Sequence, residues 1–330
     1  MMYLKGLTDR PFIAQTVNKT HNTLAMAAKK SSKNGSKNVL IGFIGQGWIG
    51  KAYADNFEER GYEVVRYSLE KPYINNKDQV KDCDIVFIAV WTPTTPKGFD
   101  ISVVESVLPL VGDGKIAVLK STIPPGTTEA LQKKFPKIIL LYSPEFLNVS
   151  SHIHDATHPF ANIVGMAHSD AKHYLAAERV MKTLPKAPYA SICKSSEAET
   201  FKYAHNAAGY AQVLIYNAMY DMAVRFGAEW DTVQKALEAD PMVSNWYIKP
   251  VHKGGRGAGG ACFIKDIAAL RGHFEKHLPH DKRVIDMLTA MEAKNIELLT
   301  STGKNLDLLE AVYGPKVLKG KKKAGGKKRG

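Results

Sequence analysis

The stretch N-V-L-I-G-F-I-G-Q-G-W-I-G, residues 38–50, contains the signal that decides the fold. Its first half is a short apolar run ending in glycine, which is typical of a buried parallel strand. The second half is a glycine-rich turn, and the polar-apolar pattern after it predicts a helix that ends at Gly61. A strand, a glycine turn and a helix in this order predict a dinucleotide-binding unit.

The three glycines of this turn have separate roles in such a unit. The first permits a tight turn, the second lets the backbone approach a pyrophosphate, and the third lets helix and strand pack closely. The amides at the start of the helix then hold the phosphate charge. We therefore expect the whole turn to bind the cofactor: Gly45, Gln46, Gly47, Trp48, Ile49 and Gly50.

The tip of the next predicted strand, Y-E-V-V-R-Y at 62–67, bears on which dinucleotide binds. An acidic residue normally stands there and binds the ribose hydroxyls, but this chain has Ser68. Glu70 could take that role, whereas Arg66 or Lys71 beside Ser68 would tolerate a 2′-phosphate. The sequence favours NAD and leaves NADP open.

Further apolar runs predict additional strands with helical or irregular links between them, at 84–90, 115–120 and 137–142. Alternation of strands and helices at this spacing predicts an α/β fold with a doubly wound parallel sheet.

After about residue 195 the strand signals stop. Ser196 and Glu199 form a capping-box signature for a long helix that runs to Gly227. The remainder predicts helices interrupted by one glycine-rich loop at 254–260.

The net charge of +13 belongs to the two ends of the chain. Residues 1–38 hold seven Lys/Arg against one Asp, and 315–330 hold eight with no acid. The remaining residues carry 30 basic and 31 acidic side chains, so no nucleic-acid partner is expected for the folded part. The C-terminal tail is expected to be disordered and solubilising. Weak adhesion to polyanions, or a nuclear address, remains the alternative role for it.

These signals predict four parts: a disordered extension (1–37), an NAD-binding Rossmann domain (38–195), a helical central domain (196–314) and a basic disordered tail (315–330). No apolar run is long enough for a membrane span, and no secretory signal is evident. The three cysteines have neither disulfide-framework nor zinc spacing. A cytoplasmic protein without a metal or a membrane partner is expected.

The segment G-G-R-G-A-G-G-A-C-F-I-K-D, residues 254–266, contains a cysteine with a distinctive setting. A thiol directly after a glycine-rich loop has backbone amides around it, which favour its thiolate and expose it. Cys83 and Cys193 have no such setting and are expected to be inert. Upstream, Lys202 and Asn206 are spaced i, i+4 and therefore share one face of the long helix.

Six motifs occur along the chain: G-F-I-G-Q-G-W-I-G, W-T-P-T-T-P, K-S-T-I-P-P-G-T-T, S-P-E-F-L, E-A-E-T-F-K-Y-A-H-N and G-A-G-G-A-C-F-I-K-D. In this order, over about residues 39–300, they resemble the UDP-glucose/GDP-mannose dehydrogenase family. That family oxidises the primary alcohol of a sugar nucleotide to a carboxylate and reduces two NAD. The resemblance implies NAD as cofactor and a sugar or nucleotide sugar as small-molecule substrate.

Oxidation as far as the acid requires a nucleophile that holds the aldehyde as a thiohemiacetal and then releases a thioester to water. By resemblance, Cys262 is that nucleophile. Lys202 and Asn206 would stabilise the developing oxyanion.

The resemblance also implies residues for the hydrolysis and for the cofactor. Asp266 and Thr122 would position or activate water, and Glu145 would assist hydrolysis. In the family the long helix builds a dimer, which implies a homodimer through 196–227. Cofactor contacts are implied for Thr92, Ser121, Lys265 and the strand-tip Ser68.

The chain departs from the family pattern in its expected grip on substrate. It ends 68 residues after Cys262, where the family has a third domain for the nucleotide handle. No arginine lies between Asp240 and Lys253; Met242 or Trp246 aligns with the family's phosphate-binding arginine. Val149 also stands where the family often has an acid. The first two of these departures, the missing domain and the missing arginine, predict altered or shared substrate binding, whereas Val149 concerns an acid near the cofactor.

Two other functions remain open from the sequence. A two-electron hydroxyacid or 6-phosphogluconate-type dehydrogenase also joins a Rossmann domain to helices and uses a lysine and an asparagine on a helix. The second alternative is a non-catalytic nucleotide-binding protein. Cys262 is the feature that separates the four-electron reaction from both.

Overall fold

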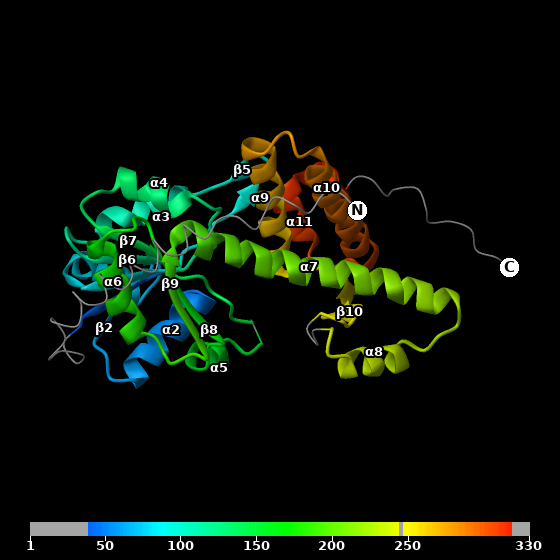
Figure 1. Ribbon diagram of the computed structural model, residues 1–330, viewed down its shortest axis with the longest axis horizontal. Helices are drawn as coiled ribbons and strands as arrows, with labels where there is room; N and C mark the ends of the chain where they lie inside the picture. Colours follow the sequence, from blue (N-terminus) through cyan, green and yellow to red (C-terminus); the bar gives the residue numbers. More distant parts are fainter. Residues whose placement is uncertain (1–38, 149, 244–246, 319–330) are drawn as a thin grey trace, which may run out of the picture. The chain divides into compact units, whose positions relative to one another are not determined.

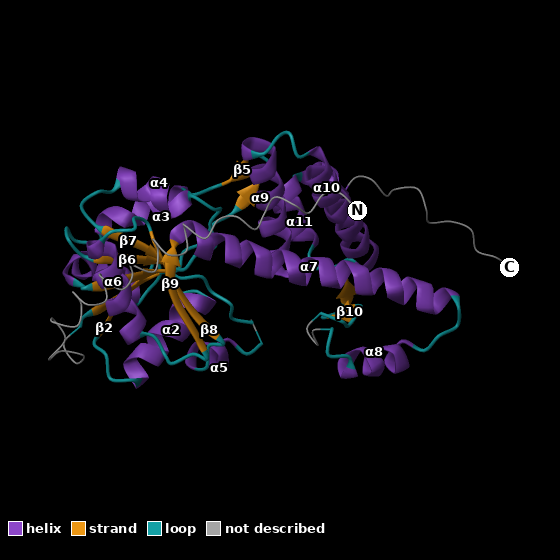
Figure 2. Ribbon diagram, viewed as in Figure 1, coloured by secondary structure: helices purple, strands orange, loops and turns teal. Residues whose placement is uncertain are grey.

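The computed structural model describes residues 39–148, 150–243 and 247–318, which divide into two compact units (Figure 1). Unit 1 is an α/β body and unit 2 is mainly helical (Figure 2). The extension predicted at 1–37 and most of the tail predicted at 315–330 lie outside the described residues. Unit 1 comprises the residues up to Ala89, Pro109–Lys120 and Thr128–Ser195; unit 2 comprises Val90–Leu108, Ser121–Thr127 and the residues from Ser196 on.

A seven-stranded sheet organises unit 1, in the order β2-β1-β3-β6-β7-β8-β9. Neighbouring strands are parallel except β7 and β8, which are antiparallel. The doubly wound fold and all five predicted strands are confirmed, whereas β8 and β9 were not predicted. The strands are β1 (Ile41–Ile44), β2 (Val64–Tyr67), β3 (Ile85–Ile88), β6 (Ile116–Leu119), β7 (Ile139–Tyr142), β8 (Ala161–Met166) and β9 (Tyr189–Lys194).

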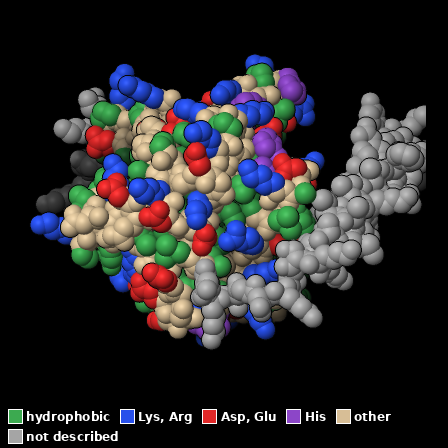
Figure 3. All heavy atoms as spheres, turned by 90° about the vertical axis from the view of Figure 1, so that its left-hand side faces the viewer, with side chains coloured by type: hydrophobic (Ala, Val, Ile, Leu, Met, Phe, Trp, Pro, Cys, Tyr) green, Lys and Arg blue, Asp and Glu red, His purple; other side chains and the backbone are tan. Residues whose placement is uncertain are grey.

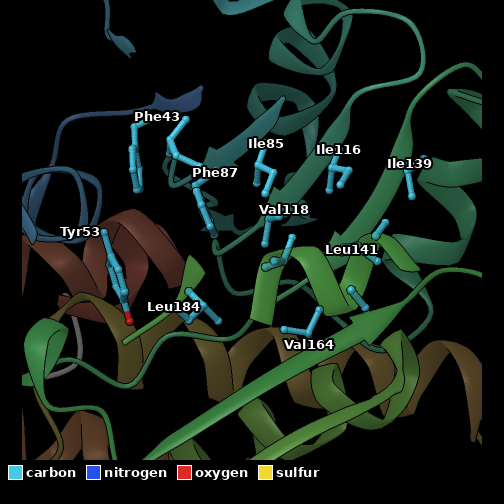
Figure 4. Close-up of a cluster of buried hydrophobic side chains, with 14 of the residues drawn as sticks. Phe43, Tyr53, Ile85, Phe87, Ile116, Val118, Ile139, Leu141, Val164 and Leu184 are labelled. Atoms are coloured by element: carbon cyan, nitrogen blue, oxygen red, sulfur yellow. The ribbon is translucent and has the colours of Figure 1, made fainter. Parts of the chain in front are cut away.

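The central strands are apolar throughout because both faces of the sheet are covered. Helices α2 (Trp48–Glu59) and α6 (Ala171–Thr183) pack on one face, and α4 (Thr127–Lys134) lies on the other (Figure 1). Alternate residues of β1, β3, β6 and β7 form the core under α2 and α6, as Figure 4 shows. Within it, the Phe43 and Phe87 rings stack at 5.0 Å. Unit 1 also contains η1 (Tyr73–Asp82) and α5 (His152–Thr157).

The strand order reverses direction at β1, which lies between β2 and β3. In open α/β sheets ligands bind outside the carboxyl ends of the strands at such a switch point. The glycine turn directly follows β1, so the topology places it at the position where a dinucleotide binds.

In unit 2 the long helix α7 (Ser195–Arg225) runs beside a group of shorter helices (Figure 1). Leu309 and Val317 belong to an apolar cluster that joins α9, α10, α11 and η3. The remaining elements are α3 (Ser102–Val107), η2 (Leu108–Leu110), α8 (Trp230–Ala239), α9 (Gly260–His277), α10 (Lys282–Thr302), α11 (Leu306–Tyr313), η3 (Pro315–Leu318), and the hairpins β4 (Thr94–Thr95) with β5 (Gly98–Phe99) and β10 (Val251–His252) with β11 (Gly255–Arg256).

Two local predictions for this half of the chain were wrong. The helix begins at Ser195, so Ser196 lies inside it and is not its cap. Instead of closing a capping box, the Glu199 carboxylate accepts a hydrogen bond from the Gly126 amide (2.6 Å). The β10–β11 hairpin also shows that strands do not stop at residue 195.

Charged side chains of both signs are interspersed on the face seen in Figure 3. Among residues 39–148, 150–243 and 247–318, no helix has the length and apolarity that crossing a membrane requires.

Candidate functional site

The glycine turn has the backbone geometry that the sequence predicted for a phosphate cradle. Gly45 has φ +91°, a conformation that favours glycine, and its amide donates to the Tyr67 carbonyl at the end of β2 (2.9 Å). Gly47 is the N-cap of α2 and makes no side-chain cap. The first amides of α2 therefore have no partner within the helix and face the position of an anion.

Gly47 and Gly50 differ in what surrounds them. A Cβ on Gly50 would overlap the Gly45 carbonyl oxygen, so this glycine is required for close contact between turn and helix. A Cβ on Gly47 would meet nothing within 4 Å. The space beside Gly47 is open for a ligand, as expected for the second glycine of the turn.

Two other residues of the turn point in different directions. Ile49 packs against the core of unit 1. Trp48 is 65% exposed, and its ring lies 4.9 Å from that of His152 in an edge contact. Gln46 donates from its side chain to the Gly45 carbonyl (3.1 Å).

Arg66 near the end of β2 and Ser68 directly after it bear on which dinucleotide binds. The buried Arg66 guanidinium is paired with Asp55 (2.7 Å) and Glu58 (2.6 Å) of α2. Arg66 is therefore not available to a phosphate on the ribose. The Ser68 hydroxyl accepts from the Glu70 amide (3.3 Å), which leaves a small polar turn at the tip.

A buried ion pair lies at the carboxyl ends of β6 and β7. Lys120 Nζ is 3.4 Å from Glu145 Oε2, donates to the Ser143 carbonyl (3.3 Å) and lies 4.2 Å from the centre of the Tyr53 ring. Glu145 Oε1 accepts from its own neighbouring amides, those of Phe146 (2.6 Å) and Leu147 (2.8 Å). The carboxylate that the resemblance assigned to hydrolysis is thus fixed in place by donors.

Tyr53 completes this cluster from α2. Burial, together with the nearby Glu145 carboxylate, raises the pKa of Tyr53 well above its ordinary value. The tyrosine therefore stays neutral and presents a ring face to Lys120. Lys120 lies in the motif K-S-T-I-P-P-G-T-T but was not predicted as a site residue. The available signal was a lysine directly after a wholly buried strand.

In unit 2 a hydrogen-bonded network joins three predicted site residues from two helices. Asn206 of α7 donates to Asp266 Oδ2 (2.6 Å), and Lys265 Nζ pairs with Asp266 Oδ1 (2.5 Å). All three side chains are buried. Each donor occupies one oxygen of the carboxylate, so Asp266 holds the amide and the ammonium in fixed orientations.

Lys202 lies one turn before Asn206 on α7 and is also buried. His205 is its neighbour, and burial together with the Lys202 charge lowers the pKa of His205 to about 4. The imidazole is neutral near pH 7. Lys202 and Lys265 are both buried in unit 2.

Two loops of unit 2 that carry predicted residues are tied to each other. Thr92 Oγ1 donates to the Thr122 carbonyl (2.9 Å), and Ser121 Oγ donates to the Val90 carbonyl (2.6 Å). Trp91, which the sequence analysis did not assign, is 55% exposed and its ring lies 5.9 Å from Lys265 Nζ. These bonds connect the loops at 90–92 and 121–122.

The three cysteines occupy different environments, and no disulfide joins them. Cys262 is exposed in the first turn of α9, directly after the glycine-rich loop. Cys83 is fully buried, and burial raises the pKa of its thiol to about 12, as expected of an inert cysteine. Cys193 is half-buried in β9.

The structure describes only some of the residues at which the chain departs from the family pattern. Met242 is 93% exposed, whereas Val149 and Trp246 lie outside the described residues. Arg256, six residues before Cys262, does not replace the missing arginine. Its guanidinium pairs with Asp221 (2.6 Å) and donates to Asn217 Oδ1 (2.9 Å), both on α7.

Curated relatives match about two thirds of the chain. The UDP-glucose 6-dehydrogenase of Pseudomonas aeruginosa is 30% identical over 236 residues, covering 67% of this chain and 51% of the relative. UDP-glucose 6-dehydrogenase TuaD of Bacillus subtilis is 29% identical over 276 residues, covering 70% and 58%. The chain thus spans between half and three fifths of the length of these relatives.

A solved UDP-glucose dehydrogenase from the archaeon Pyrobaculum islandicum has the same fold, with a TM-score of 0.68 at 24% identity over 82% of this chain and 71% of that one. Residues 66–184 match the model of the UDP-glucose/GDP-mannose dehydrogenase family NAD binding domain, and residues 196–295 match that of its central domain. The glycine turn precedes the first match and completes the NAD-binding unit structurally. The two matches follow each other in family order over more than half of the sequence, and the chain belongs to the UDP-glucose/GDP-mannose dehydrogenase family.

Proposed function

We propose that the chain oxidises the primary alcohol of a sugar or nucleotide sugar to a carboxylate, with NAD as oxidant and Cys262 as nucleophile. Its family membership and NAD-binding domain support the oxidant. The exposed thiol and the buried network in unit 2 support the nucleophile.

One observation carries the proposal. Cys262 and Asp266 are spaced i, i+4 on α9 and therefore lie on one face, one turn apart. Asp266 is the residue that holds Asn206 and Lys265. This spacing supports a nucleophilic sulfur one helical turn from a carboxylate that orients two donors, an arrangement suited to addition to a carbonyl.

The first half of the reaction uses the alcohol and the thiol. NAD, held by the glycine turn, would supply the oxidising power by accepting one hydride in each of two oxidations, so two NADH per sugar are expected. In the first oxidation the hydroxyl proton of the alcohol passes to water. The Cys262 sulfur adds to the aldehyde carbon, and the carbonyl oxygen, held by Lys202 and Asn206, takes a proton to give a thiohemiacetal. Loss of the second hydride from the same carbon, together with loss of the hydroxyl proton to water, gives a thioester.

Hydrolysis completes the reaction. Water attacks the thioester carbon, the carbon–sulfur bond breaks, and the carboxylate leaves while Cys262 recovers its proton. Asp266 and Thr122 position that water, and Glu145 assists as a fixed charge beside Lys120. The cofactor is held by the glycine turn together with Thr92, Ser121, Lys265 and Ser68.

The test compares the amount of NADH formed with the amount of sugar nucleotide consumed. The chain is mixed with NAD and, in turn, UDP-glucose, GDP-mannose and other sugar nucleotides, and NADH absorbance is compared with substrate consumed. We expect two NADH per sugar and a uronate product. One NADH with a carbonyl product would favour the two-electron dehydrogenase, and no turnover with tight NAD binding would favour the non-catalytic reading.

We also propose that the chain forms a homodimer through α7. Exposed or half-exposed apolar side chains recur along the helix at spacings of three and four, the pattern of a helix that packs against a partner. Small residues in the first half of the stripe allow close approach of two helices. The stripe consists of Phe201, Ala204, Ala208, Ala211, Ile215, Met219, Met222 and Phe226.

A matched pair of substitutions tests the dimer. Met222→Glu is expected to raise the dimer dissociation constant at least about 100-fold, because a carboxylate buried without a partner costs several kcal/mol. Met287→Glu on α10 is the control, since Met222 and Met287 are both 53% exposed. Light scattering after size exclusion measures both. A monomeric wild type, or equal effects of the two substitutions, would contradict the proposal.

A further inference from the structure

The glycine-rich loop that leads to Cys262 is held by side chains of unit 2 that lie far from it in the sequence. Asn295 of α10 makes a reciprocal pair of bonds with Ala258: its Oδ1 accepts from the Ala258 amide (2.7 Å) and its Nδ2 donates to the Ala258 carbonyl (2.9 Å). Asn295 is 2% exposed, so these bonds form away from solvent. The middle of the loop is thereby fixed in both directions.

Two residues just beyond α10 hold the loop on either side of Ala258. Lys304 Nζ donates to the Gly257 carbonyl (2.9 Å), and Asn305 Oδ1 accepts from the Gly260 amide (3.0 Å). Gly259 is the N-cap of α9 and has no side chain to cap the helix. Asn305 therefore supplies, from 45 residues away, the acceptor that the local sequence lacks.

The glycines of the loop are explained by the same contacts. Gly257 has φ +88°, and a Cβ there would lie 2.9 Å from Asn295 Oδ1. A Cβ on Gly259 would overlap Asn305 Oδ1. A glycine-rich segment is intrinsically the most flexible kind of chain, and here glycine serves close approach to side chains that immobilise it.

We infer that Asn295, Lys304 and Asn305 form a clamp that holds loop 255–260 and thereby positions the thiol of Cys262. None of the three is a catalytic residue; they act through the first turn of α9. Lys304 and Asn305 lie beyond residue 295, where the match to the family's central domain ends. The inference rests on the proposed function only for the use made of the thiol.

The clamp has a measurable chemical consequence. Amides of the first turn of a helix favour a thiolate there, but only while the turn is formed. Cys262 is already exposed, so loosening the loop adds no access to the sulfur. The remaining effect of loosening is loss of thiolate, which slows alkylation.

The test measures iodoacetamide alkylation of Cys262 in the full chain by mass spectrometry across pH. Asn305→Gly keeps the left-handed backbone of this residue (φ 53°) and removes only the cap acceptor. Asn295→Leu removes both bonds to Ala258. We expect each to slow alkylation at pH 7 about fivefold, the worth of one cap, and to shift the profile of alkylation rate to higher pH. Asn305→Asp, which keeps an acceptor, is expected to restore protection of the Gly260 amide from hydrogen exchange.

A buried amide in unit 1 provides the control. Gln132 makes comparable bonds, donating to the Phe135 and Ile138 carbonyls (both 3.0 Å) and accepting from the Leu140 amide (2.8 Å). Gln132→Leu is expected to lower the unfolding midpoint without changing the rate or the pH midpoint at Cys262. This separates positioning of the thiol from general loss of stability.

Alkylation within twofold of wild type in Asn305→Gly, or an equal slowing in Gln132→Leu, would overturn the clamp. Should Asn295→Leu fail to fold, Asn305→Gly decides, because Asn305 is only partly buried. Sugar-nucleotide turnover is measured in parallel. An inactive wild type whose alkylation still depends on Asn305 would refute the proposed reaction and leave the clamp standing.

Discussion

Replacing Cys262 with serine is expected to lower the rate of carboxylate formation at least about 10³-fold, a typical cost of removing a nucleophile. The serine hydroxyl is a far weaker nucleophile at neutral pH, so the aldehyde is not captured for the second oxidation. NADH yield should fall from two per sugar to one or less. Quenched-flow product analysis and NADH absorbance measure the two quantities.

Cys193→Ala is the matched control, since Cys193 is a second accessible thiol that lies half-buried in β9 of unit 1. It should keep the full yield of two. A Cys262→Ser variant that also yields two NADH and a carboxylate would exclude the thioester route. The two-electron alternative would then have to be joined to a separate aldehyde oxidation.

The cysteine was identifiable from sequence because its signal is local: a glycine loop, a thiol and a Lys-Asp pair occur within thirteen residues, 254–266. The partners that fix this segment were not. Asn295 and Asn305 are 37 and 45 residues from their partners. An asparagine within a helix or just after one has many ordinary roles, and only tertiary packing shows which backbone groups it meets.

The same distinction applies to the Lys120–Glu145 pair. Both residues stood in quoted motifs, K-S-T-I-P-P-G-T-T and S-P-E-F-L, but their pairing follows from the parallel register of β6 and β7. Neither motif predicts which residues of β6 and β7 lie next to each other. Glu199 failed as a capping residue for a similar reason, because the Gly126 amide on another segment binds its carboxylate.

Strand prediction succeeded where burial on both faces makes a strand continuously apolar, as in β1, β3, β6 and β7. It missed β9, the edge strand Y-A-S-I-C-K, whose residues are exposed or half-buried and partly polar. It also missed β8, a buried run that follows a short, histidine-rich helix instead of the expected alternation.

In the glycine turn, alanine at Gly50 is expected to lower the stability of the fold, whereas alanine at Gly47 is expected to lower NAD affinity at nearly unchanged stability. Gly50→Ala forces a methyl group into the Gly45 carbonyl and must move either α2 or the turn. We expect it to cost about 3 kcal/mol or more of unfolding free energy, at the upper end of overpacking substitutions. NAD binding should be lost with it. Urea unfolding followed by fluorescence measures the stability.

Gly47→Ala tests the cofactor alone. Its backbone (φ −73°, ψ −168°) is accessible to alanine and a Cβ meets no protein atom within 4 Å, so stability should change by at most about 1 kcal/mol. The methyl group would nevertheless occupy the approach of the pyrophosphate, and NAD affinity should fall at least about tenfold. Calorimetric titration with NAD measures this. Wild-type affinity in Gly47→Ala would place the pyrophosphate elsewhere, and a wild-type unfolding midpoint in Gly50→Ala would mean that α2 can slide along β1. At Gly50 the added methyl group clashes with the protein itself, whereas at Gly47 it can clash only with the bound cofactor. The two substitutions therefore separate the role of glycine in folding from its role in binding.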